Sequence, residues 1–183
     1  EVAQRHDAGA QDEGDRLQAA QVVAEAQAVV ALLRQVEQRE LFLAPVEVRP
    51  VDDDPAVALA EYIRIKMEFS RRHPQASKIF AMEVISGCEC LSEHFNQDYR
   101  NWFRGRAAVF DAWIAAGKMA PVDPMHLIFM IWSSTQHYAD FSDQIRRING
   151  KRMTRADFAH ASDNLIAIIL KGCGLTPPPP ADR

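Results

Sequence analysis

The sequence predicts an all-α fold. Beyond residue 54, apolar residues recur at spacings of three and four through most of the chain, which is the period of a helix with one buried face. No stretch of four or more residues alternates like a strand between hairpin signals. Proline and glycine occur mainly where the helical patterns stop, and they divide the chain beyond residue 54 into five predicted helices.

The first two predicted helices are bounded by capping residues. Asp54 is a good N-cap and Pro55 suits a first helical turn, so a helix is expected from Pro55 to about Arg72, where Pro74 ends it. The second spans 75–86 and ends at a glycine, which is a C-cap signal.

Three further helices follow. The third is expected over 91–117, before a glycine and a proline. Asp123 begins the fourth, over 124–141, which is the most apolar helix of the chain. Thr154 and Asp157 form a capping-box-like start for the last helix, which is expected to end near residue 171.

Composition restricts the class of protein. The 183 residues carry a net charge of -4, and the longest apolar run is six residues, whereas a membrane span needs roughly 20. We therefore expect no membrane association and, without a secretory signal at the start, a cytoplasmic protein. Three irregularly spaced cysteines, Cys88, Cys90 and Cys173, are expected to be reduced thiols.

The two ends of the chain differ from its middle. Residues 1–54 carry a net charge of -7 and no lysine; residues 1–15 are expected to be disordered, and a helix is possible over 16–44. Residues 55–174 form the predicted folded domain, and 175–183 a disordered proline-rich tail. The skewed composition before about residue 48 is interpreted as a shifted reading frame or a truncated gene model.

No catalytic or metal-binding constellation is recognisable. Cys88 and Cys90, with Glu93 and His94 nearby, lack the second ligand pair that a structural zinc site needs, so a thiol pair in a turn is favoured. Phosphate-binding, zinc-protease and nucleophile-elbow patterns do not occur. We therefore expect no enzyme, no metal and no cofactor.

The fourth helix carries an unusual pair. Trp132 and Gln136 are four residues apart and project from one face, where an indole and a carboxamide can stack on and hydrogen-bond a small planar ligand. A core tryptophan beside a satisfied glutamine is the alternative, and spacing alone favours it. Lys66 lies between apolar neighbours on the first helix, and the sequence does not decide whether it reaches solvent or points inward.

Three stretches, 62–70, 74–83 and above all 124–141, give the chain a likeness to a known family. From residue 53 to 173 it resembles the ligand-binding and dimerisation domain of TetR-family transcriptional repressors, and is most similar to the uracil-responsive branch that controls pyrimidine utilisation. The resemblance implies a helical regulatory domain with a pocket for a pyrimidine such as uracil. It also implies that helices 124–141 and 154–172 pack against a second subunit as a four-helix bundle.

A pyrimidine site needs a stacking surface and a group that both donates and accepts hydrogen bonds. Trp132 and Gln136 supply these, with Phe80 as a candidate second wall and Lys66 or Ser70 as candidate donors. The alternative function is a helical dimerisation module without a small-molecule ligand.

The last two helices carry more apolar surface than one helical layer covers, which predicts a homodimer. The residues expected to provide the interface are Ile128, Met130, Ile131, Leu165, Ile166, Ile168, Ile169 and Leu170.

The family's helix-turn-helix pattern does not occur in residues 1–54, and their acidity disfavours contact with phosphates. Operator DNA is therefore expected as a partner only of a full-length family member, not of this chain alone.

Overall fold

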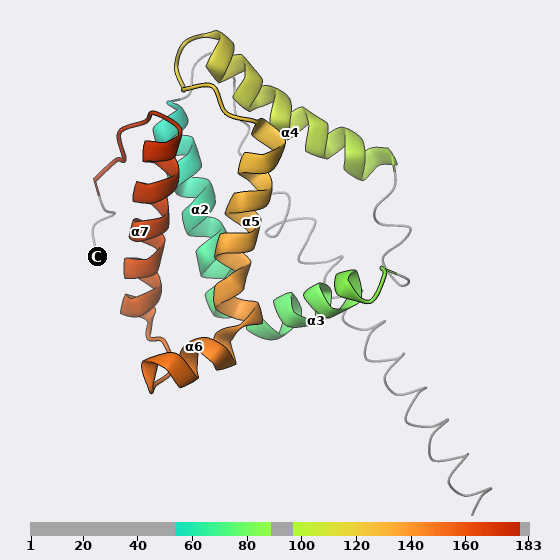
Figure 1. Cartoon of the computed structure of the whole chain (residues 1–183), viewed down its shortest axis with the longest axis vertical. Helices are drawn as coiled ribbons and strands as arrows, with labels where there is room; N and C mark the ends of the chain where they lie inside the picture. The colour runs from blue at the N-terminus through green and yellow to red at the C-terminus, as the bar shows by residue number, and fades with distance from the viewer. Residues whose placement is uncertain (1–53, 89–96, 180–183) are drawn as a thin grey trace, which may run out of the picture.

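The computed structural model of the chain describes residues 54–88 and 97–179. Predictions for the first segment, for Cys90, Glu93 and His94, and for the end of the tail lie outside these described residues. Within them the chain is helical and contains no strand, which confirms the all-α class (Figure 1). The helices are α2 (Pro55–Arg72), α3 (Pro74–Ile85), α4 (Gln97–Ala115), α5 (Pro124–Asp140), α6 (Ser142–Asn149) and α7 (Arg155–Gly172).

Helix α2 is the centre of the fold. It packs against both α5 and α7, which lie on either side of it (Figure 1). Leu59, Ile63 and Met67, spaced by four residues, are at most 2% exposed and form its core face. Ile131 of α5 and Leu170 of α7, both fully buried, join the same core. The packing of these three helices therefore buries one continuous apolar core.

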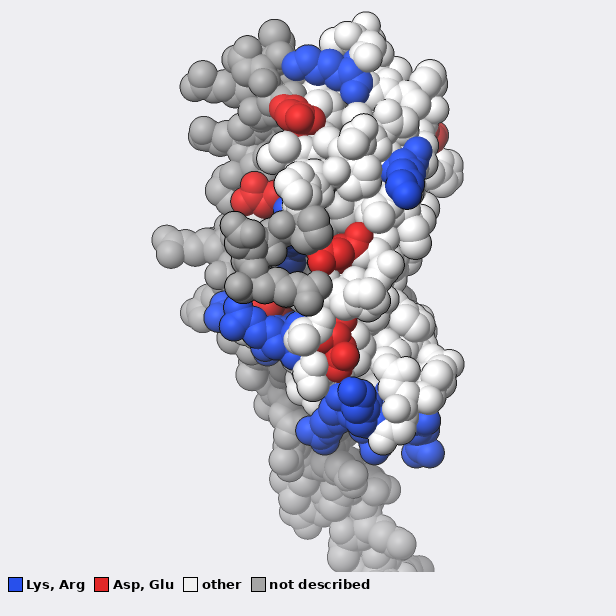
Figure 2. All heavy atoms as spheres, turned by 90° about the vertical axis from the view of Figure 1, so that its left-hand side faces the viewer, with Lys and Arg blue, Asp and Glu red and all other residues white. Residues whose placement is uncertain are grey.

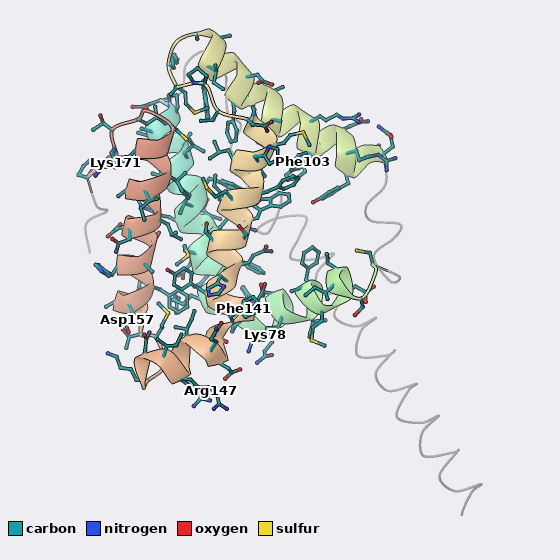
Figure 3. The ribbon with its side chains drawn as sticks, viewed as in Figure 1. Lys78, Phe103, Phe141, Arg147, Asp157 and Lys171 are labelled. Atoms are coloured by element: carbon teal, nitrogen blue, oxygen red, sulfur yellow. The ribbon has the colours of Figure 1, made fainter. Side chains whose placement is uncertain are left out.

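Helices α3 and α4 both pack against α5. Phe103 of α4 lies against α5 (Figure 3), with its ring centroid 5.4 Å from that of Phe129 and 5.6 Å from that of Trp132. Side chains from α2, α3 and α4 thus converge on the middle of α5.

The capping residues begin the helices where the sequence predicted. The Asp54 carboxylate accepts a hydrogen bond from the backbone N–H two residues later at 2.8 Å, and Asp123 accepts one from the N–H three residues later at 3.0 Å. Thr154 and Asp157 form the reciprocal capping box at the start of α7.

Helix α6 lies between the predicted helices over 124–141 and from Thr154, where the sequence pattern predicts no helix. Its only apolar side chains are Ile145 and Ile148, and none of its residues is buried. The sequence therefore lacks the apolar stripe from which a helix is predicted. A left-handed Gly150 ends it. The Lys78 ammonium lies 3.0 Å from the Asp143 carboxylate and links α3 to α6.

Basic side chains gather at the end of the molecule where α6 lies (Figure 2). No helix in the described part of the chain is both long and apolar enough to span a bilayer.

Candidate functional site

Trp132 of α5 is held by a second helix. Its indole Nε1 donates a hydrogen bond to the phenolic oxygen of Tyr62 on α2 at 2.6 Å. The edge-to-face contact with Phe103 fixes the ring from α4. The indole is therefore fixed in one orientation by contacts from two neighbouring helices.

Lys66 points into the protein. Its side chain is 1% exposed, and its ammonium lies 5.9 Å from the centroid of the Trp132 ring. This is within the range of a cation–π interaction, which is stronger when the pair is removed from water. The alternative that Lys66 reaches solvent is therefore wrong, and its donors lie beside the predicted stacking surface.

Ser70 is also buried, but its hydroxyl is already used as a donor. It donates to the backbone carbonyl of Thr135 on α5 at 2.9 Å. The expectation that Ser70 donates to a ligand therefore needs correction, because a hydroxyl has only one hydrogen. In this geometry the Ser70 oxygen can accept a hydrogen bond.

Tyr62, Lys66 and Ser70 occupy one face of α2, because they are spaced by four residues. Burial raises the pKa of Tyr62 to about 12, and this outweighs the lowering by its hydrogen bond with Trp132 and by the Arg106 charge. Tyr62 is therefore a neutral phenol at physiological pH. The role of Tyr62 was missed, although its spacing to Lys66 was the available signal.

Phe80 of α3 belongs to the same aromatic cluster as Trp132. Phe80, Tyr99, Trp102 and Trp132 pack against the buried Phe69 and Ala76. Phe80 is thus placed in the neighbourhood expected of a second wall, and its contact with a ligand stays a prediction.

Gln136 lies one helical turn beyond Trp132 and is half-buried. Its carboxamide makes no hydrogen bond to another described residue, so its donors and its acceptor are both available. The interpretation of Gln136 as a satisfied core residue therefore has no hydrogen bond in the described structure to support it.

Most residues assigned to the dimer interface lie in the core of a single subunit. Ile128, Ile131, Ile166, Ile169 and Leu170 are at most 3% exposed, and Leu165 is partly buried. One subunit alone therefore already buries the first five of these side chains, and the dimer interface itself stays a prediction. Met130 and Ile168 are 47% and 68% exposed and remain candidates.

The cluster brings together groups that can bind a ligand. It offers an indole face, a buried ammonium, a free carboxamide and a neutral phenol, which together suit a small flat ring with polar edges. Among the described residues, no three His, Cys, Asp or Glu side chains are grouped as a metal site requires.

A helical domain with such a cluster between its central helices is typical of the effector-binding domain of a regulator. Residues 33–176 match the family model described as "YcdC-like protein, C-terminal region", and the chain belongs to this family of TetR-type transcriptional regulators. The match begins at residue 33, whereas the folded domain was expected to start at residue 55.

Curated relatives agree with this family. The chain is similar to the proteins named "HTH-type transcriptional regulator RutR" of Escherichia coli O157:H7, of Escherichia coli strain K12 and of Shigella flexneri. Each is 40% identical over 144 residues, which are 78% of this chain and 67% of the relative.

Proposed function

We propose that this chain is the effector-binding and dimerisation part of a repressor of pyrimidine utilisation, and that it senses a pyrimidine base such as uracil. The observation that carries the proposal is the burial of Lys66 against the Trp132 ring, with the unbonded Gln136 one turn away. The family membership supports the regulatory role.

The chemistry of the ring matches this cluster. Uracil has a flat face for stacking and an edge on which carbonyl oxygens alternate with N–H groups. Trp132 supplies the stacking surface, and Lys66 and the Gln136 amide supply donors to the carbonyls. The Gln136 carbonyl and the Ser70 oxygen supply acceptors for the ring N–H groups.

The regulatory mechanism follows from which helices hold the ligand. A pyrimidine that contacts both α2 and α5 binds most tightly when its binding groups on the two helices lie close to it. Binding therefore favours that arrangement of the two helices. In a family member with a DNA-binding headpiece, this shift changes the affinity for operator DNA. Operator DNA in turn changes the affinity for the pyrimidine by the same factor. We further propose that the protein acts as a homodimer in the cytoplasm and is not an enzyme.

A thermal-shift titration with uracil and thymine tests the proposal. A ligand that binds only the folded state raises the melting temperature with its concentration, so uracil is expected to stabilise the chain. Gln136→Ala is expected to reduce the shift, whereas the control Gln144→Ala, on the exposed α6, retains it. No shift with either base would support the alternative, a dimerisation module without a ligand.

A further inference from the structure

A pocket lies between α2 and α7, away from the proposed pyrimidine site. It has a volume of about 230 Å³. Its walls are Arg64, Met67 and Glu68 of α2 with Arg155, Phe158, Ala159, Ser162 and Asp163 of α7. Arg64 and Glu68 are four residues apart and share a face of α2 that is different from the face of Lys66 and Ser70. The two sites therefore use different sides of the central helix.

Ser162 has an unsatisfied hydroxyl. Its residue is 6% exposed, and its Oγ has no hydrogen-bond partner among the described residues. A buried polar atom without a partner destabilises the folded state, and such atoms are rare in folded proteins. The hydroxyl therefore lacks a partner among the described residues, at a place where a pocket is available.

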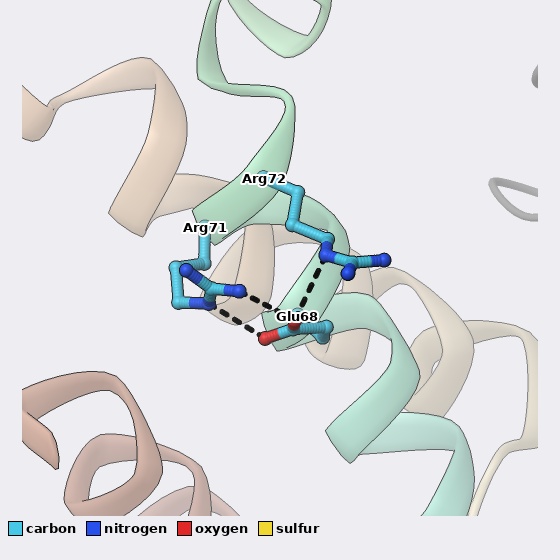
Figure 4. Close-up of polar contacts among 3 residues, drawn as sticks. All are labelled: Glu68, Arg71 and Arg72. Atoms are coloured by element: carbon cyan, nitrogen blue, oxygen red, sulfur yellow. Dashed lines mark hydrogen bonds and ion pairs between the residues drawn. The ribbon is translucent and has the colours of Figure 1, made fainter. Parts of the chain in front are cut away.

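The carboxylate of Glu68 is already neutralised. Arg71 forms two hydrogen bonds of 2.7 Å to it, and Arg72 lies 3.2 Å from it (Figure 4). The hydrogen bond from Arg71 is the main cause that holds the pKa of Glu68 below its usual range. Glu68 therefore does not need the remaining arginines of the pocket as counter-ions.

Those arginines, Arg64 and Arg155, make no ion pair within 4.0 Å with a carboxylate of the described residues. Arg155 acts on Glu68 only through its longer-range charge. A guanidinium binds a carboxylate through two parallel N–H groups, so the pocket offers cationic donors beside the unsatisfied hydroxyl.

The remaining walls limit the kind of anion. Met67, Phe158 and Ala159 are apolar and can cover the body of a small ligand. Asp163 also lines the pocket. The lining is therefore suited to an anionic group attached to an apolar body.

We propose that this pocket is a second ligand site, which binds a small monocarboxylate with an apolar body. Arg64 and Arg155 hold the carboxylate, Ser162 donates a hydrogen bond to it, and Met67 and Phe158 cover the apolar part. The site is distinct from the pyrimidine site and does not depend on the function proposed for it.

Nuclear magnetic resonance of the arginine Nε–Hε groups in the full chain tests this site directly. Benzoate is the probe, and sodium chloride at the same ionic strength is the control. Benzoate is expected to shift the signals of Arg64 and Arg155, and chloride is not. Ser162→Ala is expected to weaken benzoate binding roughly tenfold, which corresponds to one hydrogen bond to a charged group. Arg155→Gln is expected to weaken it at least as much.

Two further variants separate the possible outcomes. Arg104→Gln, at an exposed position of α4, and Gln136→Ala, in the pyrimidine site, are both expected to bind benzoate as the parent does. The proposal is overturned if tens of millimolar benzoate shifts neither arginine, which leaves water as the partner of Ser162. An equal response to inorganic phosphate would overturn the assignment of an apolar monocarboxylate.

Discussion

The Trp132 indole donates to the Tyr62 phenol at 2.6 Å, and this bond joins α5 to α2 beside the buried Lys66. The indole also contacts Phe103, and Tyr62 packs against the core cluster, so both partners of the bond are held by neighbouring side chains. The orientation of the stacking surface therefore depends on a residue of another helix.

Replacing Tyr62 tests how much this bond contributes. Tyr62→Phe removes the acceptor at 2.6 Å and is expected to lower the free energy of unfolding by about 1–3 kcal/mol, measured in urea. Tyr138→Phe is the matched control, because the Tyr138 hydroxyl makes no hydrogen bond to a described residue and its loss is expected to change little. An equal loss in both variants would show that the Tyr62 bond is not the cause.

Stability at high pH follows from the raised pKa of Tyr62. The pKa rises from 10.0 to about 12 on folding, so between these values the unfolded state loses the proton while the folded state keeps it. The contribution is fully present below pH 10 and falls as pH rises toward 12, by about 2–3 kcal/mol in total. Tyr62→Phe is expected to lose this part of the pH dependence in urea melts between pH 9 and about 11. A parallel decline in parent and variant would contradict it.

Gly174 lies two residues beyond the end of α7, and both its backbone conformation and its surroundings require glycine. Its φ is +70°, and an added Cβ would lie 2.9 Å from the Cβ of Ala120, beside the hydrogen bond from the Ala120 N–H to the Cys173 carbonyl. Gly174→Ala is expected to destabilise the fold by about 1–3 kcal/mol in thermal or urea melts. Gly105→Ala, in α4 with open space around it, is expected to be neutral or stabilising. The same sign for both variants would refute the steric argument.

The dimer interface is expected on the exposed side of α7. Ile168→Glu, at a side chain that is 68% exposed, is expected to leave a folded monomer by circular dichroism and light scattering. Ile148→Glu on α6, where the side chain is 76% exposed, serves as the control and is expected to remain a dimer. A parent that is monomeric at micromolar concentration, or an Ile168→Glu variant that remains dimeric, would place the interface elsewhere.

The helix boundaries were predictable because the capping residues are local. Asp54, Asp123 and Thr154 satisfy backbone N–H groups within their own first turns, so the sequence alone defines these starts. Helix α6 was not predicted because its two apolar side chains, the half-buried Ile145 and the exposed Ile148, form no buried stripe in the sequence pattern.

The faces of the two apolar helices were not predictable. Residues 127–132 are all apolar, so periodicity does not tell the core side from the exposed side, and buried Ile131 and exposed Met130 look alike in the sequence. The direction of Lys66 was undecided for the same reason, since the packing of α5 over α2 determines it. The pair Trp132 and Gln136 was found because their spacing is local to one helix.

Isothermal titration of uracil into the parent, Gln136→Ala and Trp132→Ala chains tests the pyrimidine site most directly. The parent is expected to bind uracil, and Gln136→Ala to bind about ten- to a hundredfold more weakly, because one buried hydrogen-bond partner contributes about 1–3 kcal/mol. Trp132→Ala is expected to lose the stacking surface and to bind more weakly too, with dimerisation intact in both variants. If both variants bind uracil with the affinity of the parent, the site lies elsewhere and the assignment of these residues is wrong.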